Sequence, residues 1–345
     1  MVANVGGQVT AQSFLRPGGV TSIGSLPHRD ADAAAAFVLK HHSSLPAAPQ
    51  LPRRSALEGM VAQAARGIAG VTVDTGGHLV VDRARLDPEA PVTPMFDGAG
   101  HGGLLAFLSH AAGRTDPVKI QMTGPVTLGC ALVDAGAGAD VAFRVAVTAV
   151  RAQGRALLAL VRHRLPDAPL VAFLDEPGLV DVGEGCRVPL TAEATIDLLS
   201  TGLAALEGVA VTGVHCCGTT DLRLVVAAGP DIISIPAEDD IVLPVANLLT
   251  SHIERGGWVA WGAIPTSKPL GTDADRLWRK LSLLWSDLVQ AGADPVLLRA
   301  RALVTPACGL AGHGVSQAAR ALRMTKTLSD RVADQAAATR LSVGA

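Results

Sequence analysis

Residues 209–218, with the sequence VAVTGVHCCG, show the pattern that decides the fold of this chain. A short apolar run over residues 209–214 ends at a histidine, two cysteines and a glycine. Short apolar runs bounded by turn-forming residues are typical of strands buried in a parallel sheet. Similar runs, each followed by Gly, Pro or polar residues, occupy residues 118–122, 170–174, 231–235, 258–263 and 302–305.

The segments between these runs have the spacing of amphipathic helices, as over residues 141–164, 192–206 and 273–291. Strands that alternate with helices predict βα units and a parallel sheet. Because six or more units follow one another without a break in composition, we expect an α/β fold, a single (β/α)8 TIM barrel over residues 19–332. A doubly wound open sheet is the alternative. In a barrel, the residues after each strand lie at the C-terminal mouth, where active sites are found.

Both ends of the chain and one insertion fall outside the repeated units. We expect residues 1–18 to form an N-terminal extension and residues 333–345 a C-terminal tail. Two short alternating runs, 71–74 and 78–82, are joined by Thr75-Gly76-Gly77. This pattern predicts a β-hairpin insertion near the N-terminus of the barrel.

The composition excludes several classes of protein. The chain has 345 residues, of which 49% are hydrophobic and 17% charged, and its net charge is −2. Disorder requires low hydrophobicity and high net charge, and a nucleic acid or an anionic membrane would require a basic block. No apolar run reaches the roughly 18 residues of a membrane span, and the first residues do not resemble a signal peptide. We therefore expect a soluble globular protein with no nucleic-acid or membrane partner.

The cysteine count points to free thiols. Five cysteines, an odd number in a long chain, do not form a disulfide framework, which indicates the reducing cytoplasm. We expect Cys130, in an apolar helical segment, to belong to the core. Cys186 lies in a glycine-rich loop, and we assign it no function. Tyrosine is absent, so no tyrosine can act as a general acid.

His215-x-Cys217 is the strongest candidate for a metal site. Residues i and i+2 of a strand face the same side, so His215 and Cys217 point together while Cys216 points away. Neutral imidazole and thiolate are standard zinc ligands, and a third ligand can come from a distant strand end. Cys308, after the last predicted strand, is the natural candidate. The alternative is that these are small buried residues with inert thiols.

Two further strand ends carry polar groups suited to a substrate. Asp175-Glu176-Pro177 closes an apolar strand, and one of its carboxylates must face the barrel interior, where it could receive an amino group or act as a base. A turn or a helix cap is the alternative for this motif. The segment Ile23-Gly24-Ser25 could present backbone N–H groups and a hydroxyl to a carboxylate.

Taken together, these motifs resemble the catalytic C-terminal half of the cobalamin-independent methionine synthase family, within the superfamily that includes uroporphyrinogen decarboxylases. The resemblance spans roughly residues 20–325 in the family's order. The motifs that carry it are Ser22-Ile23-Gly24-Ser25, Gly124-Pro125-Val126-Thr127, Asp175-Glu176-Pro177, His215-x-Cys217 and Pro306-Ala307-Cys308-Gly309-Leu310.

The resemblance implies a zinc-dependent methyltransferase that moves a methyl group onto the thiol of homocysteine to give methionine. Zinc coordination deprotonates a thiol, and the resulting thiolate attacks an electrophilic methyl group. By the same resemblance, His215, Cys217 and Cys308 hold the metal, and Ile23, Gly24 and Ser25 hold the carboxylate of the amino acid. Asp175, with Glu176 beside it, receives the ammonium group.

Three departures from the family leave the donor and the acid open. Pro236 occupies the position of the family's zinc-binding glutamate, so either Glu238 or Asp239 takes its place, or three residues hold the metal. The family's acidic-end histidine is absent, and His28 is the candidate replacement. The N-terminal half that accompanies the folate-dependent enzymes has no counterpart, which leaves the methyl donor open, with a methylated corrinoid on a carrier protein and a folate as candidates.

Two other functions compete with methyl transfer. One is a barrel that binds zinc or a ligand without turnover. The other is a lyase of the uroporphyrinogen decarboxylase type, whose substrate would require an arginine cluster that the sequence does not show.

Overall fold

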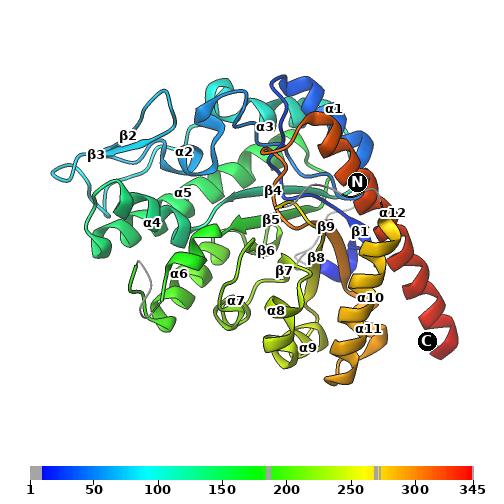
Figure 1. Cartoon of the computed structure of the whole chain (residues 1–345). Helices are drawn as coiled ribbons and strands as arrows, with labels where there is room; N and C mark the ends of the chain where they lie inside the picture. Colours follow the sequence, from blue (N-terminus) through cyan, green and yellow to red (C-terminus); the bar gives the residue numbers. More distant parts are fainter. Residues whose placement is uncertain (1–9, 184–187, 268–270, 272, 344–345) are drawn as a thin grey trace, which may run out of the picture.

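Seven parallel strands form a curled sheet with helices on its outer face in a computed structural model of the chain (Figure 1). The structure describes residues 10–343 except residues 184–187, 268–270 and 272. The order of strands in the sheet is β1-β9-β8-β7-β6-β5-β4, and every neighbouring pair is parallel. The strands are β1 (Gly19–Val20), β4 (Val118–Thr123), β5 (Leu170–Asp175), β6 (Val211–His215), β7 (Ile232–Pro236), β8 (Trp258–Ile264) and β9 (Ala302–Pro306).

The sheet resembles a TIM barrel but is not closed by a continuous ladder, so the prediction of a fully closed (β/α)8 barrel needs correction. An irregular segment, residues 46–50, lies between β1 and β4. The Ala48 N–H donates to the Lys119 carbonyl of β4 (2.8 Å), and the Gln50 N–H donates to the Gly24 carbonyl beyond β1 (3.1 Å). This segment has prolines at positions 46 and 49, which lack the N–H groups of a regular ladder. The position of an eighth strand is therefore filled by isolated bridges.

The helices connect the strands and cover the outside of the sheet (Figure 1). Many begin at an aspartate whose carboxylate accepts backbone N–H bonds, as Asp273 does at the start of α10. The α-helices are α1 (Ala31–His41), α2 (Met60–Ala65), α3 (Gly98–His110), α4 (Pro125–Asp134), α5 (Ala139–Arg164), α6 (Ala192–Ala204), α7 (Leu222–Ala228), α8 (Asp239–Val242), α9 (Ala246–Glu254), α10 (Ala274–Gln290), α11 (Pro295–Ala300) and α12 (Val315–Val343). Short 3₁₀ turns are η1 (Ala11–Ser13), η2 (Ala56–Glu58), η3 (Pro177–Asp181) and η4 (Leu243–Val245).

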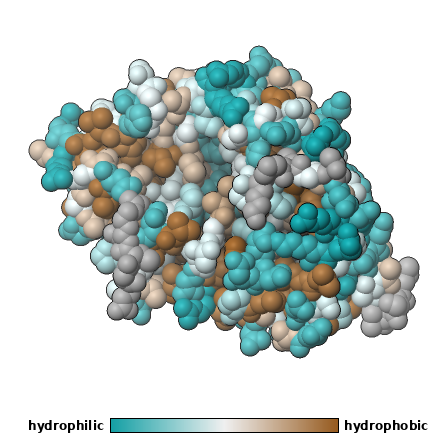
Figure 2. Space-filling model, viewed as in Figure 1, coloured by the Kyte–Doolittle hydropathy of each residue, from teal (hydrophilic) through white to brown (hydrophobic). Residues whose placement is uncertain are grey.

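The predicted β-hairpin is confirmed. Strands β2 (Val71–Val73) and β3 (Leu79–Val81) pair antiparallel, and Gly77 in the turn has a φ of +84°, which glycine adopts without strain. Apolar residues gather over this part of the surface (Figure 2), and Val80 of β3 is 57% exposed.

The core has two parts. The larger part lies between the sheet and the helices. The smaller part fills the N-terminal end of the barrel interior with Phe173, Trp258 and Leu303, among others. Ala11 and Leu15 pack against it, so the described part of the predicted N-terminal extension closes this end of the barrel. Helix α12 continues past residue 333, through the start of the predicted tail.

Candidate metal centre

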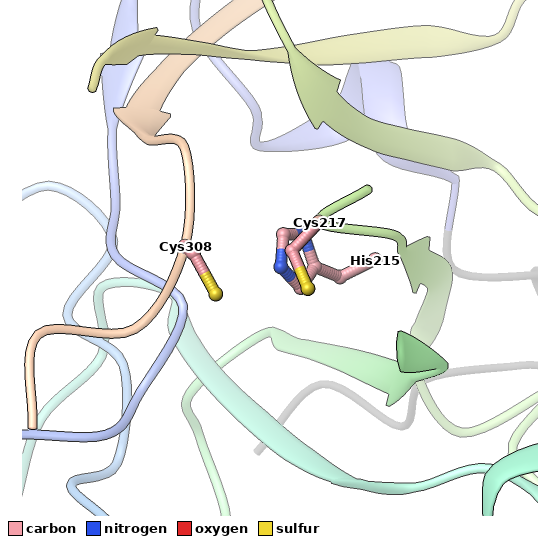
Figure 3. A group of neighbouring side chains, drawn as sticks. All are labelled: His215, Cys217 and Cys308. Atoms are coloured by element: carbon pink, nitrogen blue, oxygen red, sulfur yellow. The ribbon is translucent and has the colours of Figure 1, made fainter. Parts of the chain in front are cut away.

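Two strand ends bring His215, Cys217 and Cys308 together (Figure 3). His215 is the last residue of β6, Cys217 follows two residues later, and Cys308 follows β9. One ligand atom from each lies within 4.8 Å of the others. Ligands of one tetrahedral zinc ion, with Zn–S near 2.3 Å and Zn–N near 2.0 Å, are about 3.5–3.8 Å apart. Small side-chain rotations would therefore complete the site.

The surroundings of His215 leave one ring nitrogen for a metal. Its Nδ1 is hydrogen-bonded to the Ser234 hydroxyl on β7 at 3.0 Å. Its Nε2 is buried and has no hydrogen-bond partner among the described residues. A histidine held at one nitrogen by a neighbouring polar group, with the other nitrogen bare, is the usual arrangement of a metal ligand.

The two thiols influence one another. A hydrogen bond between them lowers the pKa of the Cys308 thiol to about 4 and raises that of Cys217. The pair therefore favours a thiolate, the form of cysteine that binds metals. Cys216 lies in the core between sheet and helices, so it points away from the pair as predicted. Burial there raises the pKa of its thiol.

A cavity of about 360 Å³ opens beside the three residues. Ile23, Ser25 and Asp175 also line it, so these predicted substrate-binding residues lie on the same cavity as the metal group. Gly309 allows the loop after β9 to lie close to Ser25, because a Cβ at Gly309 would lie 1.9 Å from the Ser25 hydroxyl oxygen. The Leu310 N–H, which follows, donates to the Ser25 carbonyl (2.8 Å).

Asp175 lines this cavity and has a buried oxygen without a hydrogen-bond partner in the described part of the chain. The residue is 5% exposed, and its Oδ1 has no hydrogen-bond partner among the described residues. Burial raises the pKa of the carboxyl to about 6, although the nearby charges of Lys119 and His215 lower it. A buried carboxylate with a bare oxygen is suited to receive a cationic or hydrogen-bond-donating group.

Glu176 is engaged elsewhere. Its carboxylate accepts the Val126 N–H (3.0 Å), the Thr127 N–H (2.7 Å) and the Thr127 hydroxyl (2.6 Å) at the start of α4. Burial raises the pKa of this carboxyl to about 7, while the hydrogen bonds oppose the shift. A cap on α4 was the alternative for this motif, and the geometry favours it over substrate binding.

Glu238 and His28 lie outside the group of three. The Glu238 carboxylate pairs with Lys280 and is not among the clustered ligands. The His28 ring packs against Phe37 in a tilted arrangement with centroids 4.6 Å apart, and burial lowers the pKa of His28. The predicted roles of both residues therefore gain no support from their positions. Cys186 lies outside the described residues.

Two buried charged residues near the cavity were not anticipated. Glu58 lines it at 0% exposure and accepts the N–H groups of Leu51 (3.1 Å) and Gly103 (3.3 Å), besides pairing with Arg54. Lys119 is 1% exposed within β4. The sequence signal for Lys119 was a lysine inside an otherwise buried strand, which is rare without a partner.

No helix within the described residues is long and apolar enough to cross a membrane. No protein-family model and no curated protein matches the chain. Its fold is nevertheless shared by solved structures. One is a B12-independent methionine synthase from Shewanella sp. W3-18-1 in complex with selenomethionine, at TM-score 0.59 and 13% identity, covering 93% of this chain and 99% of that one.

A second similar structure is a methyltransferase from Methanosarcina mazei, at TM-score 0.56 and 14% identity, covering 88% of this chain and 86% of that one. At such low identity the two similarities establish the fold. The chemistry depends on the residues of this chain.

Proposed function

We propose that this chain is a zinc-dependent methyltransferase that transfers a methyl group to the thiol of homocysteine, giving methionine. The observation that carries the proposal is the His215–Cys217–Cys308 group on the wall of a cavity that Asp175 and Ser25 also line. Two sulfur donors and one nitrogen donor with a fourth position toward the cavity match a catalytic zinc site.

The residues present fit zinc without a fourth protein ligand. The bare Nε2 of His215 and the low pKa of the Cys308 thiol supply two ligand atoms in the required state. The pKa of the Cys217 thiol is raised by its hydrogen bond to Cys308, so binding of zinc would have to displace the proton of Cys217. When bound, zinc would hold a substrate thiol in its deprotonated, nucleophilic form at neutral pH. The sulfur of homocysteine would then bond to the methyl carbon, and the electron pair of the broken carbon–donor bond would leave with the donor.

The amino-acid end of the substrate is assigned to two walls of the cavity. The Ser25 hydroxyl and the backbone at Gly24 would receive the carboxylate, and the Asp175 carboxylate would receive the ammonium group. An ammonium group supplies the positive charge that keeps Asp175 ionised in a buried position. With the carboxylate and the ammonium group held in this way, the thiol would point toward the metal. Such positioning of the attacking sulfur favours a nucleophilic displacement.

The candidate methyl donors are a methylated corrinoid on a carrier protein and a folate. The cytoplasm is the proposed location because the thiols must stay reduced. A lyase of the uroporphyrinogen decarboxylase type fits less well. Among the described residues no arginine lines the cavity, whereas a substrate with many carboxylates would require several.

The first experiment tests whether the protein binds zinc at this group. We expect about one zinc per chain by elemental analysis of the wild-type protein, and a loss of zinc in Cys308→Ala. Cys130→Ala, which changes a core cysteine of α4, is the matched control and should retain zinc. Equal zinc in Cys308→Ala and the control would contradict the proposal.

Turnover is tested next with homocysteine and either methylcobalamin or methyltetrahydrofolate, with methionine followed by mass spectrometry. Methionine formation with one donor, abolished in Cys308→Ala, is the expected result. Zinc and homocysteine binding without methionine from either donor would instead indicate the non-catalytic barrel.

A further inference from the structure

Lys119 is an ammonium group buried in the barrel beneath the cavity wall. Its Nζ donates to the Ile23 carbonyl at 2.7 Å and to the Gln121 side-chain oxygen at 3.3 Å. It also lies 4.6 Å from the centroid of the Phe173 ring. Two hydrogen bonds and one cation–π contact are interactions that an ammonium group makes. Burial lowers the pKa of Lys119 to about 8, and these contacts, with the charge of Asp175, offset part of the cost of burying the ammonium group.

The contact with Ile23 fixes a peptide that borders the cavity. The carbonyl of Ile23 and the N–H of Gly24 belong to one trans peptide unit, so they point in opposite directions. Lys119 holds the oxygen, which turns the Gly24 N–H to the other side. Among the described residues this N–H has no hydrogen-bond partner, while Ile23 and Ser25 on either side of it line the cavity.

Gln121 supports the same segment from below. Its side-chain nitrogen donates to the Ala48 carbonyl at 2.7 Å, in the segment that bridges β1 and β4. A Cβ at Gly24 would lie 2.3 Å from this nitrogen, and Gly24 has a φ of +142°. The backbone at Gly24 therefore rests directly on the Lys119–Gln121 pair, and only glycine allows this close approach.

We propose that Lys119 is a positioning residue that sets the selectivity of the cavity for thiols carrying a carboxylate. It does so by aiming the Gly24 N–H at the carboxylate and by placing a positive charge behind the same peptide. Asp175 supplies the opposite charge for the ammonium group, so the cavity distinguishes the two ends of a zwitterion. This inference rests on the proposed function, because it assumes that an amino-acid thiol occupies the cavity.

The test compares two thiols on zinc-loaded protein by isothermal titration calorimetry. L-homocysteine carries both charged groups, and 2-mercaptoethanol carries neither, so their ratio of dissociation constants measures selectivity apart from binding of the sulfur. In Lys119→Met we expect homocysteine to bind about tenfold more weakly or worse, as for the loss of a charge-assisted hydrogen bond. Binding of 2-mercaptoethanol and zinc content should stay within twofold of wild type.

Two other variants guard against a folding defect. Lys119→Arg keeps the charge and should recover part of the selectivity. Gly24→Ala shifts the same backbone from above and should lose selectivity, while Lys119 itself is unchanged.

A weakening of both thiols by the same factor in Lys119→Met would show a merely structural role and overturn the inference. So would unchanged homocysteine binding in that variant. If wild-type protein with zinc does not prefer homocysteine over 2-mercaptoethanol, the substrate assignment falls and the inference falls with it. If the wild type shows the preference and the variants keep it, only the role of Lys119 is overturned.

Discussion

The two ends of the barrel interior are built from the same strands but have opposite character. At the N-terminal end the inward side chains are apolar and buried, as with Val171, Val211 and Trp258. At the C-terminal end they are polar and buried, and Asp175 and His215 each have an atom without a hydrogen-bond partner among the described residues. The first end therefore stabilises the fold, and the second retains unpaired groups that a ligand can satisfy.

Strand pleating places the two ends only a few residues apart. Val171, Phe173 and Asp175 face inward along β5, and Gly213 and His215 face inward beside them on β6. A Cβ at Gly213 would lie 2.5 Å from the Phe173 ring, so glycine makes room for the apolar layer directly below the histidine. The boundary between the stabilising and the functional end thus falls within two residues on each strand.

Trp258→Ala tests the stabilising end and should have the largest effect. Trp258 is 3% exposed in the apolar cluster, and its strand contributes no residue to the lining of the metal cavity. We expect the free energy of unfolding, measured by urea denaturation of the metal-free protein, to fall by about 3–5 kcal/mol. The folded variant should still bind about one zinc.

Trp258→Phe is the matched control and should lose much less stability, because most of the buried volume is kept. Loss of zinc from folded Trp258→Ala would break the comparison, since it would mean that the two ends are not independent.

Glu176→Ala tests a residue that lies at the C-terminal end of the barrel but whose carboxylate accepts hydrogen bonds from the start of α4. Removal of the carboxylate leaves the buried N–H groups of Val126 and Thr127 without their acceptor. We expect the free energy of unfolding to fall by about 2–3 kcal/mol, since an unsatisfied buried group costs about 1–3 kcal/mol.

Glu176→Gln keeps an acceptor oxygen and should be less destabilised, with the wild-type dissociation constant for homocysteine. Stability near wild type in both variants, combined with loss of homocysteine binding, would instead support the substrate-binding role that the motif first suggested.

The sequence could predict which residues meet at the mouth because parallel strands align their C-terminal ends. To predict that His215, Cys217 and Cys308 meet, only the ends of two strands had to be located, and the hydrophobic pattern located both. The alternation of a strand also separated Cys216 from Cys217. These parts of the site depend on local rules that a single sequence contains.

Other features depend on contacts between segments far apart in the chain. The bridging segment 46–50 is rich in proline and has no strand signal, so its place in the barrel follows only from its bonds to β4 and to Gly24. Glu176 could have faced the cavity or α4, and only the position of the helix decides between them. Glu238 pairs with Lys280, 42 residues away, which no local pattern indicates.

Ser234→Ala sharpens the comparison at the metal group and should have the smallest effect. The Ser234 hydroxyl is the hydrogen-bond partner of His215 Nδ1, so it fixes the ring with Nε2 toward the cysteines. Loss of such a partner weakens metal binding by roughly 10–100-fold, and we expect about tenfold because a water molecule can replace a hydroxyl. Zinc affinity is measured by competition with a chelator at fixed pH.

Thr305→Val is the matched control for this variant. Thr305 faces inward on β9, two residues beyond Leu303 of the apolar cluster, and its hydroxyl has no partner among the described residues. It should therefore bind zinc as wild type does. Equal weakening in both variants would mean that the polarity of this layer, and not the bond to His215, controls the metal. Unchanged affinity in Ser234→Ala would mean that the cysteines and the strand backbone alone hold the imidazole in place.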